Sequence, residues 1–142
     1  MRFMVIVLAS VLLVGVAMAS KSDWTGSAKC GSCHPQHLAA WLKTPHASTA
    51  KRFPTKPASK CLGCHGTGDA PAGTAIAVEV GCEACHGAGV AYAEDDIMRS
   101  RTVARALGLS DTTDRAKVCL TCHARQTKTK FDVTAPVHPV KK

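Results

Sequence analysis

The most regular hydrophobic pattern lies at the start of the chain, where an almost unbroken apolar run covers residues 3–16 after a single basic residue, Arg2. The run ends in Ala-Met-Ala, the small-x-small arrangement that a signal peptidase cleaves. This pattern predicts a secretory signal peptide over residues 1–19 and a mature domain over residues 20–142. The alternative is an uncleaved anchor helix, because residues 3–20 reach the lower limit of a membrane-spanning length.

Beyond this run, the hydrophobic pattern is broken into short segments that favour helices. We expect helical structure at about residues 28–44, 46–53, 99–107 and 112–124, and one strand at residues 75–80. Gly108 is suited to end the third of these helices, and Ser110 with Asp111 to cap the fourth. The pattern predicts one domain that is mainly α with much irregular structure.

The side chains that can form a hydrophobic core are few. After residue 19, the large aromatic residues are Trp24, Trp41, Phe53, Tyr92 and Phe131. A domain of this size buries only a modest share of its surface, so it needs either covalent cross-links or a core that is not made of peptide. The eight cysteines of the chain can provide either.

All eight cysteines occur in pairs with the spacing Cys-x-x-Cys. The pairs are Cys30/Cys33, Cys61/Cys64, Cys82/Cys85 and Cys119/Cys122. An exported chain with an even number of cysteines ordinarily suggests disulfides, but a disulfide stabilises a protein most when it closes a long loop. Gaps of two residues give little of that benefit. We therefore interpret the pairs as sites of ligand binding or cofactor attachment.

A histidine follows each cysteine pair directly, and we number the resulting motifs one to four in chain order. The histidines are His34, His65, His86 and His123. With 7 histidines among 142 residues, chance gives this placement with a probability of about one in 10⁵. Cys-x-x-Cys-His is the attachment signal of c-type haem. The alternative is a zinc module of the form Cys-x-x-Cys-x-Gly-x-Gly, but only motifs two and three carry its glycines, whereas haem attachment explains all four motifs and the predicted export.

Each motif is expected to attach one haem through its two cysteines and to supply its histidine as the first axial ligand of the iron. Four haem c groups in the mature domain give one haem per roughly 31 residues. The porphyrins then form most of the hydrophobic core, which accounts for the small number of aromatic side chains. This predicts a small multihaem cytochrome c fold organised around four closely packed covalent haems.

Three further histidines and one methionine are candidates for the second axial positions. A Thr-Pro pair favours a helix that begins just before His46 and holds it in the first turn. Prolines on both sides of His138 favour an extended tail that crosses the molecule and delivers this imidazole. His37 lies too close to motif one to reach the far face of its own haem, and it either meets a neighbouring haem or stays solvated. Met98 is either a ligand that raises the haem potential or a packing residue.

Three stretches of the chain resemble the cytochrome c-554 family of multihaem cytochromes. They are KCGSCHPQHLAAWLKTPHA, VGCEACHGAGVAY followed by IMRSR, and VCLTCHARQTKTKFDVTAPVHP. The resemblance runs from Lys29 to about Pro139. The chain departs from the family in its short length, in the compact loop between motifs two and three, and in His37, which replaces a residue that is not usually a ligand.

The resemblance also implies a set of axial ligands. The implied pairs are His46 with His86 on the third haem, His138 with His123 on the fourth, and Met98 with His34 on the first. Met98 enters this set because the segment after motif three, which supplies the ligand in similar proteins, contains no histidine here. The haem attached beside His65 is then left without a strong second ligand.

The formal net charge of +8 falls to +7 when the predicted signal peptide is removed. Each haem carries two propionates, so much of the lysine and arginine is expected to balance them, and we expect no nucleic-acid partner. The basic residues within 51–60 and at 141–142 suit an acidic redox partner protein. Membrane association is expected only if the N-terminal segment is not cleaved.

These features together predict a periplasmic or extracellular electron carrier rather than an enzyme. The chain offers no acid–base or nucleophile constellation apart from the haem ligands. The alternative is a haem enzyme that reduces a small nitrogen oxide or peroxide at a five-coordinate haem, for which His37 is the available imidazole and Asp95 with Asp96 the nearest acidic pair.

Overall fold

A computed structural model describes residues 23–52, 59–67, 78–124 and 131–138 of the chain. Helices dominate these residues, and none of them forms a strand. The predicted signal peptide lies outside the described ranges. Within those ranges, no helix has the length and apolar character needed to cross a membrane.

The helices are short, and four of them carry the cysteine motifs. In chain order, the structure contains α1 (Ser27–Cys33), α2 (Pro35–Trp41), the 3₁₀ helix η1 (Pro45–Arg52), α3 (Ser59–His65), α4 (Cys82–His86), α5 (Asp95–Met98), α6 (Arg101–Ala106) and α7 (Arg115–His123). Helices α3, α4 and α7 end at the histidine of their motif, and α1 ends one residue before it. Motifs two and three thus each form a short helix.

The first predicted helix is divided in two, and a short helix that the pattern did not predict precedes the third. In each case, a residue with non-helical backbone angles separates the two helices. His34 has φ −118° and ψ 57° and separates α1 from α2, because the ring of Pro35 disfavours helical geometry at the residue before it. Ser100 has φ −111° and ψ 99° and separates α5 from α6. Its hydroxyl accepts a hydrogen bond from the Val103 amide at 3.4 Å, as a helix N-cap does.

The ends of the later helices agree only in part with the sequence pattern. Gly108 follows α6 with a φ of 111°, as expected for a residue that ends a helix. The predicted cap of the fourth helix is wrong, because α7 begins later and Asp114 accepts the Lys117 amide at 3.0 Å. Asp111 instead forms a local turn with Thr113. Of the predicted strand, residues 78–80 are not in a strand, and residues 75–77 lie outside the described ranges, as does Phe53 at the end of the predicted second helix.

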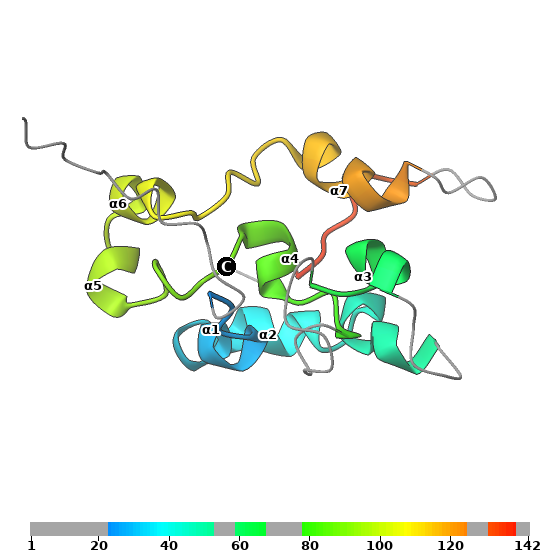
Figure 1. The fold of residues 1–142 in the computed structure, drawn as a ribbon, viewed down its shortest axis with the longest axis horizontal. Helices are drawn as coiled ribbons and strands as arrows, with labels where there is room; N and C mark the ends of the chain where they lie inside the picture. Colours follow the sequence, from blue (N-terminus) through cyan, green and yellow to red (C-terminus); the bar gives the residue numbers. More distant parts are fainter. Residues whose placement is uncertain (1–22, 53–58, 68–77, 125–130, 139–142) are drawn as a thin grey trace, which may run out of the picture.

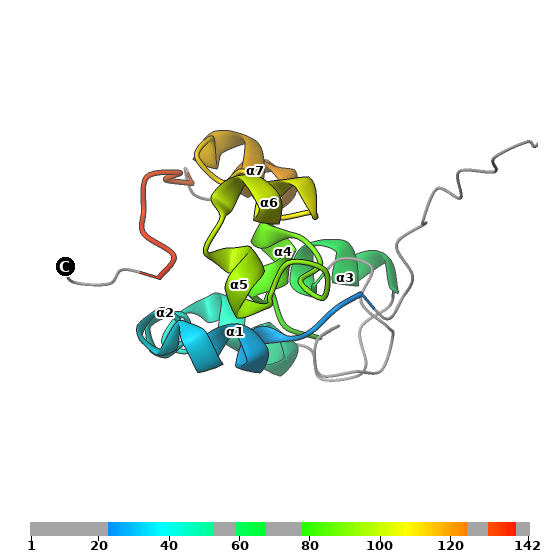
Figure 2. The ribbon, with the colours of Figure 1, turned by 90° about the vertical axis from the view of Figure 1, so that its left-hand side faces the viewer.

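Helix α4 lies near the centre of the molecule, with α1 and α2 on one side and α6 and α7 on the other (Figures 1 and 2). Hydrogen bonds tie the segment around α4 to distant parts of the chain. Trp41 donates through Nε1 to the Val80 carbonyl at 3.0 Å, and the Ser110 amide donates to the carbonyl of His86 at 2.9 Å. Motif three is therefore held in the middle of the fold by contacts from both sides.

The peptide core among the described residues is small and partly polar. The buried apolar side chains are Trp41, Tyr92 and Ala104, and the buried polar ones are Ser27, Thr49, Thr67 and Glu83. No buried side-chain nitrogen or oxygen in this part of the chain lacks a hydrogen-bond partner. A core of this size agrees with the expectation that the aromatic content is too low for an ordinary hydrophobic interior.

Candidate cofactor-binding site

A cavity of about 490 Å³ lies between the helices that carry motifs one, three and four. The motif side chains that line it are Cys30, His34, Cys82, Cys85, His86 and Cys119. The three histidines outside the motifs, His37, His46 and His138, line the same cavity. The fold thus collects imidazoles from α2, η1 and the C-terminal segment around one space, although they are far apart in the sequence.

The cysteines show which motifs are neighbours. Interaction with the Cys82 thiol raises the pKa of Cys30 above its usual range, and the same interaction lowers the pKa of Cys82 to about 7. Burial raises the pKa of Cys85, and the nearby Cys119 thiol raises it further. These groups would be thioethers once haem is attached, so the shifts matter here as signs of proximity. Motif one lies beside motif three, and motif three beside motif four.

Motif two lies on the other side of motif four. The Cys122 thiol points at the Gly63 carbonyl, with 3.8 Å between sulfur and oxygen. Burial raises the pKa of Cys122 to about 11, and its interaction with the Cys64 thiol contributes. Helix α3 packs against α7 accordingly, and α1 packs against α4. The four motifs therefore follow one another in space in the order one, three, four, two.

Two histidines from outside the motifs each lie beside a motif histidine. The ring centroids of His46 and His123 are 6.0 Å apart, and those of His86 and His138 are 6.3 Å apart. A ring nitrogen binds a metal at about 2 Å, so two imidazoles on opposite faces of one iron have centroids roughly 6 Å apart. Both pairs have this separation. They differ from the pairs that the family resemblance implies, in which His46 faces His86 and His138 faces His123.

The exchange of partners follows from the way the chain segments cross. Val80, just before motif three, donates its amide to the carbonyl of His46 at 3.3 Å, which holds η1 beside α4 and directs the His46 side chain past it toward α7. The C-terminal segment returns from α7 toward the centre. Its residue Phe131 stacks on His123 at 3.9 Å, and His138 reaches motif three.

His37 occupies a place among the other imidazoles. Its ring centroid lies 5.1 Å from that of His138 and 5.9 Å from that of His34. Burial lowers the pKa of His37, and the neighbouring His138 and His34 rings lower it further. His37 therefore lies at the cavity between motifs one and three, and it favours the neutral form that can bind a metal.

Burial also lowers the pKa of His46 and His86. The His123 ring adds to the effect at His46, and the His138 ring adds to it at His86. Iron binds the neutral imidazole, since a protonated ring nitrogen has no lone pair to give. The electrostatics of the cavity thus favour the ligand form of both side chains.

Met98 lies at the end of α5 and lines both the large cavity and a second one of about 270 Å³. Cys30, Cys33 and His34 of motif one also line this second cavity. The structure therefore brings Met98 close to motif one. Motif two differs: Cys61, Cys64 and His65 line neither cavity, and His65 is exposed at the end of α3.

The acidic pair nominated for an enzyme pocket is not near motif two. Asp95 forms an ion pair with Arg99 at 2.6 Å and lines the second cavity, beside motif one. Asp96 is exposed. Asp95 therefore lies beside motif one rather than beside motif two, for which the pair was nominated.

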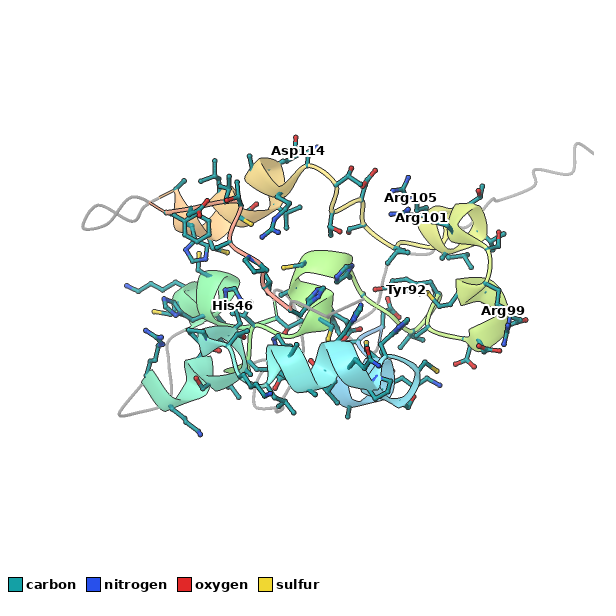
Figure 3. All side chains as sticks on the ribbon, turned by 180° about the vertical axis from the view of Figure 1, so that it is seen from behind. His46, Tyr92, Arg99, Arg101, Arg105 and Asp114 are labelled. Atoms are coloured by element: carbon teal, nitrogen blue, oxygen red, sulfur yellow. The ribbon has the colours of Figure 1, made fainter. Side chains whose placement is uncertain are left out.

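Three arginines that line the site belong to none of the four motifs, and the sequence analysis did not single them out. Arg101, Arg105 and Arg115 line the large cavity, and Figure 3 shows Arg101 and Arg105 pointing from α6 toward the centre while Arg99 points outward. Arg105 also pairs with Asp111 at 2.9 Å. The spacing of Arg101 and Arg105 places both on one helix face, which was a usable signal.

Comparison with known proteins finds similarity to one family. The family described as cytochrome c554 and c-prime matches residues 29–87. These residues include motifs one, two and three, and the match supports the resemblance to cytochrome c-554. Cytochrome c-554 of Nitrosomonas europaea is 30% identical to it over 103 residues, which cover 55% of this chain and 44% of the relative. The chain thus spans less than half the length of that curated cytochrome c-554, and no solved structure matches it.

Similarity to this family implies covalently bound haem c with its iron, and the residues of the site fit this cofactor. Paired thiols stand directly before an imidazole in each motif. Motifs one, three and four face a common cavity, with further imidazoles at the separation of axial ligands. Among the described residues, no group of three or more histidine, cysteine or acidic side chains is arranged to hold a bare metal ion, which is the arrangement that the zinc alternative requires.

Proposed function

We propose that the chain is a periplasmic electron-transfer protein that carries electrons through four covalently bound c-type haems. The observation that supports this most strongly is the spatial order of the motifs, in which each cysteine pair lies beside the pair of the next motif. Bound haem supplies reversible one-electron oxidation and reduction at its iron. The chain spaces the cofactors, supplies their axial ligands and sets the charges around them.

The ligand set follows from the motifs and the ring distances. Four histidines are the first axial ligands, namely His34, His65, His86 and His123. Among the second ligands, we assign His46 to the iron of motif four and His138 to that of motif three, because the ring separations of 6.0 Å and 6.3 Å suit these pairs. Met98 is assigned to motif one because both line the same small cavity. Among the residues that the structure describes, we assign no second ligand to motif two.

The arginines of the cavity fit the propionates of the haems. Arg101 and Arg105 are four residues apart on α6, so their like charges repel unless an anion lies between them. The ion pair with Asp111 neutralises only one of the two. Guanidinium groups bind carboxylates through two parallel hydrogen bonds, and propionates at this edge of the cavity balance both arginines.

The predicted signal peptide and the basic charge complete the proposal. Export agrees with haem attachment, and the formal charge of +8 suits a redox partner protein whose docking surface is acidic. The donor and acceptor proteins are thus expected to be recognised by charge. We propose no nucleic-acid partner, and membrane association only where the N-terminal segment is retained.

The test compares the loss of an internal motif with the loss of a terminal one. The wild-type protein, matured in a host that attaches c-type haem, is expected to contain four haems by mass and by optical spectrum. Replacing both cysteines of motif four (Cys119→Ala with Cys122→Ala) removes the haem between motifs three and two, so reduction by a chemical donor becomes biphasic. The matched control, Cys61→Ala with Cys64→Ala, removes a terminal haem and leaves reduction of the other three monophasic.

Three results would contradict the proposal. Fewer than four haems on the wild-type chain would refute the haem count, and bound zinc without haem would refute the cofactor. Identical reduction kinetics in the two variants, with three haems in each, would refute the spatial order on which the electron-transfer role rests.

A further inference from the structure

Glu83 lies between the two cysteines of motif three and is 3% exposed. Its carboxylate accepts three hydrogen bonds, all from backbone amides. Oε1 accepts from Thr25 at 2.9 Å and from Gly89 at 2.6 Å, and Oε2 accepts from Gly26 at 2.7 Å. No lysine or arginine in the described part of the chain forms an ion pair with it.

This arrangement suits an ionised carboxylate. Each oxygen receives N–H donors, and an ionised carboxylate is an acceptor only, whereas a protonated one must donate. Backbone dipoles stabilise the charge without cancelling it, because an amide carries no net charge. A net negative charge therefore remains inside the protein, where it is screened much less than a charge at the surface.

The carboxylate lies where motifs one and three meet. Thr25 and Gly26 directly precede α1, which carries motif one, and Glu83 itself is part of α4. The three hydrogen bonds thus join the starts of both motif helices. The Cys82 amide donates to the Ser27 hydroxyl at 3.2 Å, which strengthens the same junction.

The field of Glu83 reaches the cavity. Tyr92 is buried and lines both cavities. Burial raises the pKa of its hydroxyl, and the nearby Glu83 carboxylate contributes to the same upward shift. A group that lines the cavity therefore responds to this carboxylate, and cofactors held beside motifs one and three lie in the same field.

We propose two roles for Glu83. It is a positioning residue that holds motif one against motif three, and its fixed negative charge lowers the reduction potential of the haems attached there. The inference rests on the proposed function, since it requires haem at both motifs. Reduction adds an electron to the cofactor, and a nearby negative charge in a poorly screened interior opposes this.

The central experiment measures the reduction potentials of Glu83→Gln by spectroelectrochemical titration of the fully matured protein. Glutamine keeps the size of the side chain and removes the charge. We expect four haems and an upward shift of at least one potential. The control, Glu94→Gln, removes the same charge from an exposed side chain (62% exposed) paired with Lys29, and we expect unchanged potentials because water and salt screen it.

A second variant separates the charge from the packing. A Cβ added at Gly89 would lie 2.9 Å from Oε1 of Glu83 and 2.9 Å from Cγ2 of Thr25. Gly89→Ala therefore crowds the same junction while it keeps the carboxylate. We expect a lower midpoint of thermal unfolding and wild-type potentials. If Gly89→Ala shifts the potentials as much as Glu83→Gln, the packing and not the charge is responsible, and the proposal is wrong.

Infrared spectra of the wild-type protein keep the proposal testable if Glu83→Gln fails to mature. The chain has three glutamates, at 79, 83 and 94, and ¹³C-labelled glutamate identifies their bands. We expect only carboxylate bands at neutral pH, and a protonated carboxyl band would overturn the fixed charge. Glu83→Gln with four haems and wild-type potentials would overturn the proposal without affecting the proposed function, which fails only if the wild-type chain lacks its haems.

Discussion

At the scale of single residues, the cavity is defined by side chains that contact one another from distant parts of the chain. The His46 and His123 rings, and the His86 and His138 rings, come within about 6 Å of each other. Sequence analysis identified all four histidines, because composition leaves few candidates for iron binding. The family resemblance paired them the other way round, and no local pattern says which of two neighbouring motifs an imidazole faces.

Met98 is the residue whose role the optical spectrum can decide. If Met98 ligates the iron of motif one, the ferric protein has the near-infrared band of methionine-to-iron coordination, and Met98→Ala removes this band. The variant also lowers the reduction potential of that haem, since methionine ligation raises the potential. The matched variant is His37→Ala, whose ring also lies near His34. Loss of a low-spin signal in His37→Ala, with the spectrum of Met98→Ala unchanged, would assign the ligand to His37 instead.

At the scale of elements, the short helices are divided and ended by individual residues. Pro35 separates α1 from α2, and Ser100 separates α5 from α6. The hydrophobic pattern merged α1 and α2 into one longer helix, because the apolar spacing continues across the first break. It missed α5, which is a single short turn. Pro35 is a sequence signal that predicts the first helix boundary, whereas a serine inside an apolar pattern predicts a helix boundary only weakly.

Gly87, just after motif three, is the glycine that the fold requires most. It has φ 85° and ψ 165°, a region that only glycine occupies without strain. A Cβ there would also lie 2.6 Å from the Gly108 carbonyl oxygen. We expect Gly87→Ala to reduce the free energy of unfolding by roughly 2–4 kcal/mol, measured by denaturant titration of the matured protein.

The matched control is Gly63→Ala, at a glycine that lies between the two cysteines of motif two. Gly63 is helical, and an added Cβ meets no atom within 4 Å. Alanine favours helices over glycine by up to about 1 kcal/mol, so we expect no loss of stability. Equal destabilisation by both alanines would show that the backbone at Gly87 is not special.

At the scale of the whole molecule, the helices surround a central α4 (Figure 1) and contribute few buried apolar side chains among the described residues, namely Trp41, Tyr92 and Ala104. The entropy lost when the chain orders is of the order of 1–2 kcal/mol per residue, which so few side chains cannot offset. The fold is therefore expected to depend on its cofactors, as the low aromatic content predicts.

The chain produced without haem attachment is accordingly expected to lack a stable fold. Its far-ultraviolet circular dichroism should show little helix and no cooperative thermal transition, and proteases should cleave it rapidly, whereas the matured protein resists them. The comparison is made at equal protein concentration under reducing conditions, so that disulfides do not replace the missing attachments. Cooperative unfolding of the haem-free chain would show that the peptide core suffices.

The sequence by itself determined the cofactor chemistry, because attachment and the first axial ligand depend on residues within a span of five positions, such as Cys82 to His86. Composition and the apolar start of the chain also led to the expectations of export and of a cofactor-built core. The tertiary structure decided which motifs are neighbours, which motif His46 and His138 face, and where Glu83 and the cavity arginines lie. These relations join segments that are distant in the chain, and they depend on backbone hydrogen bonds, such as that from Val80 to His46, which no local pattern encodes.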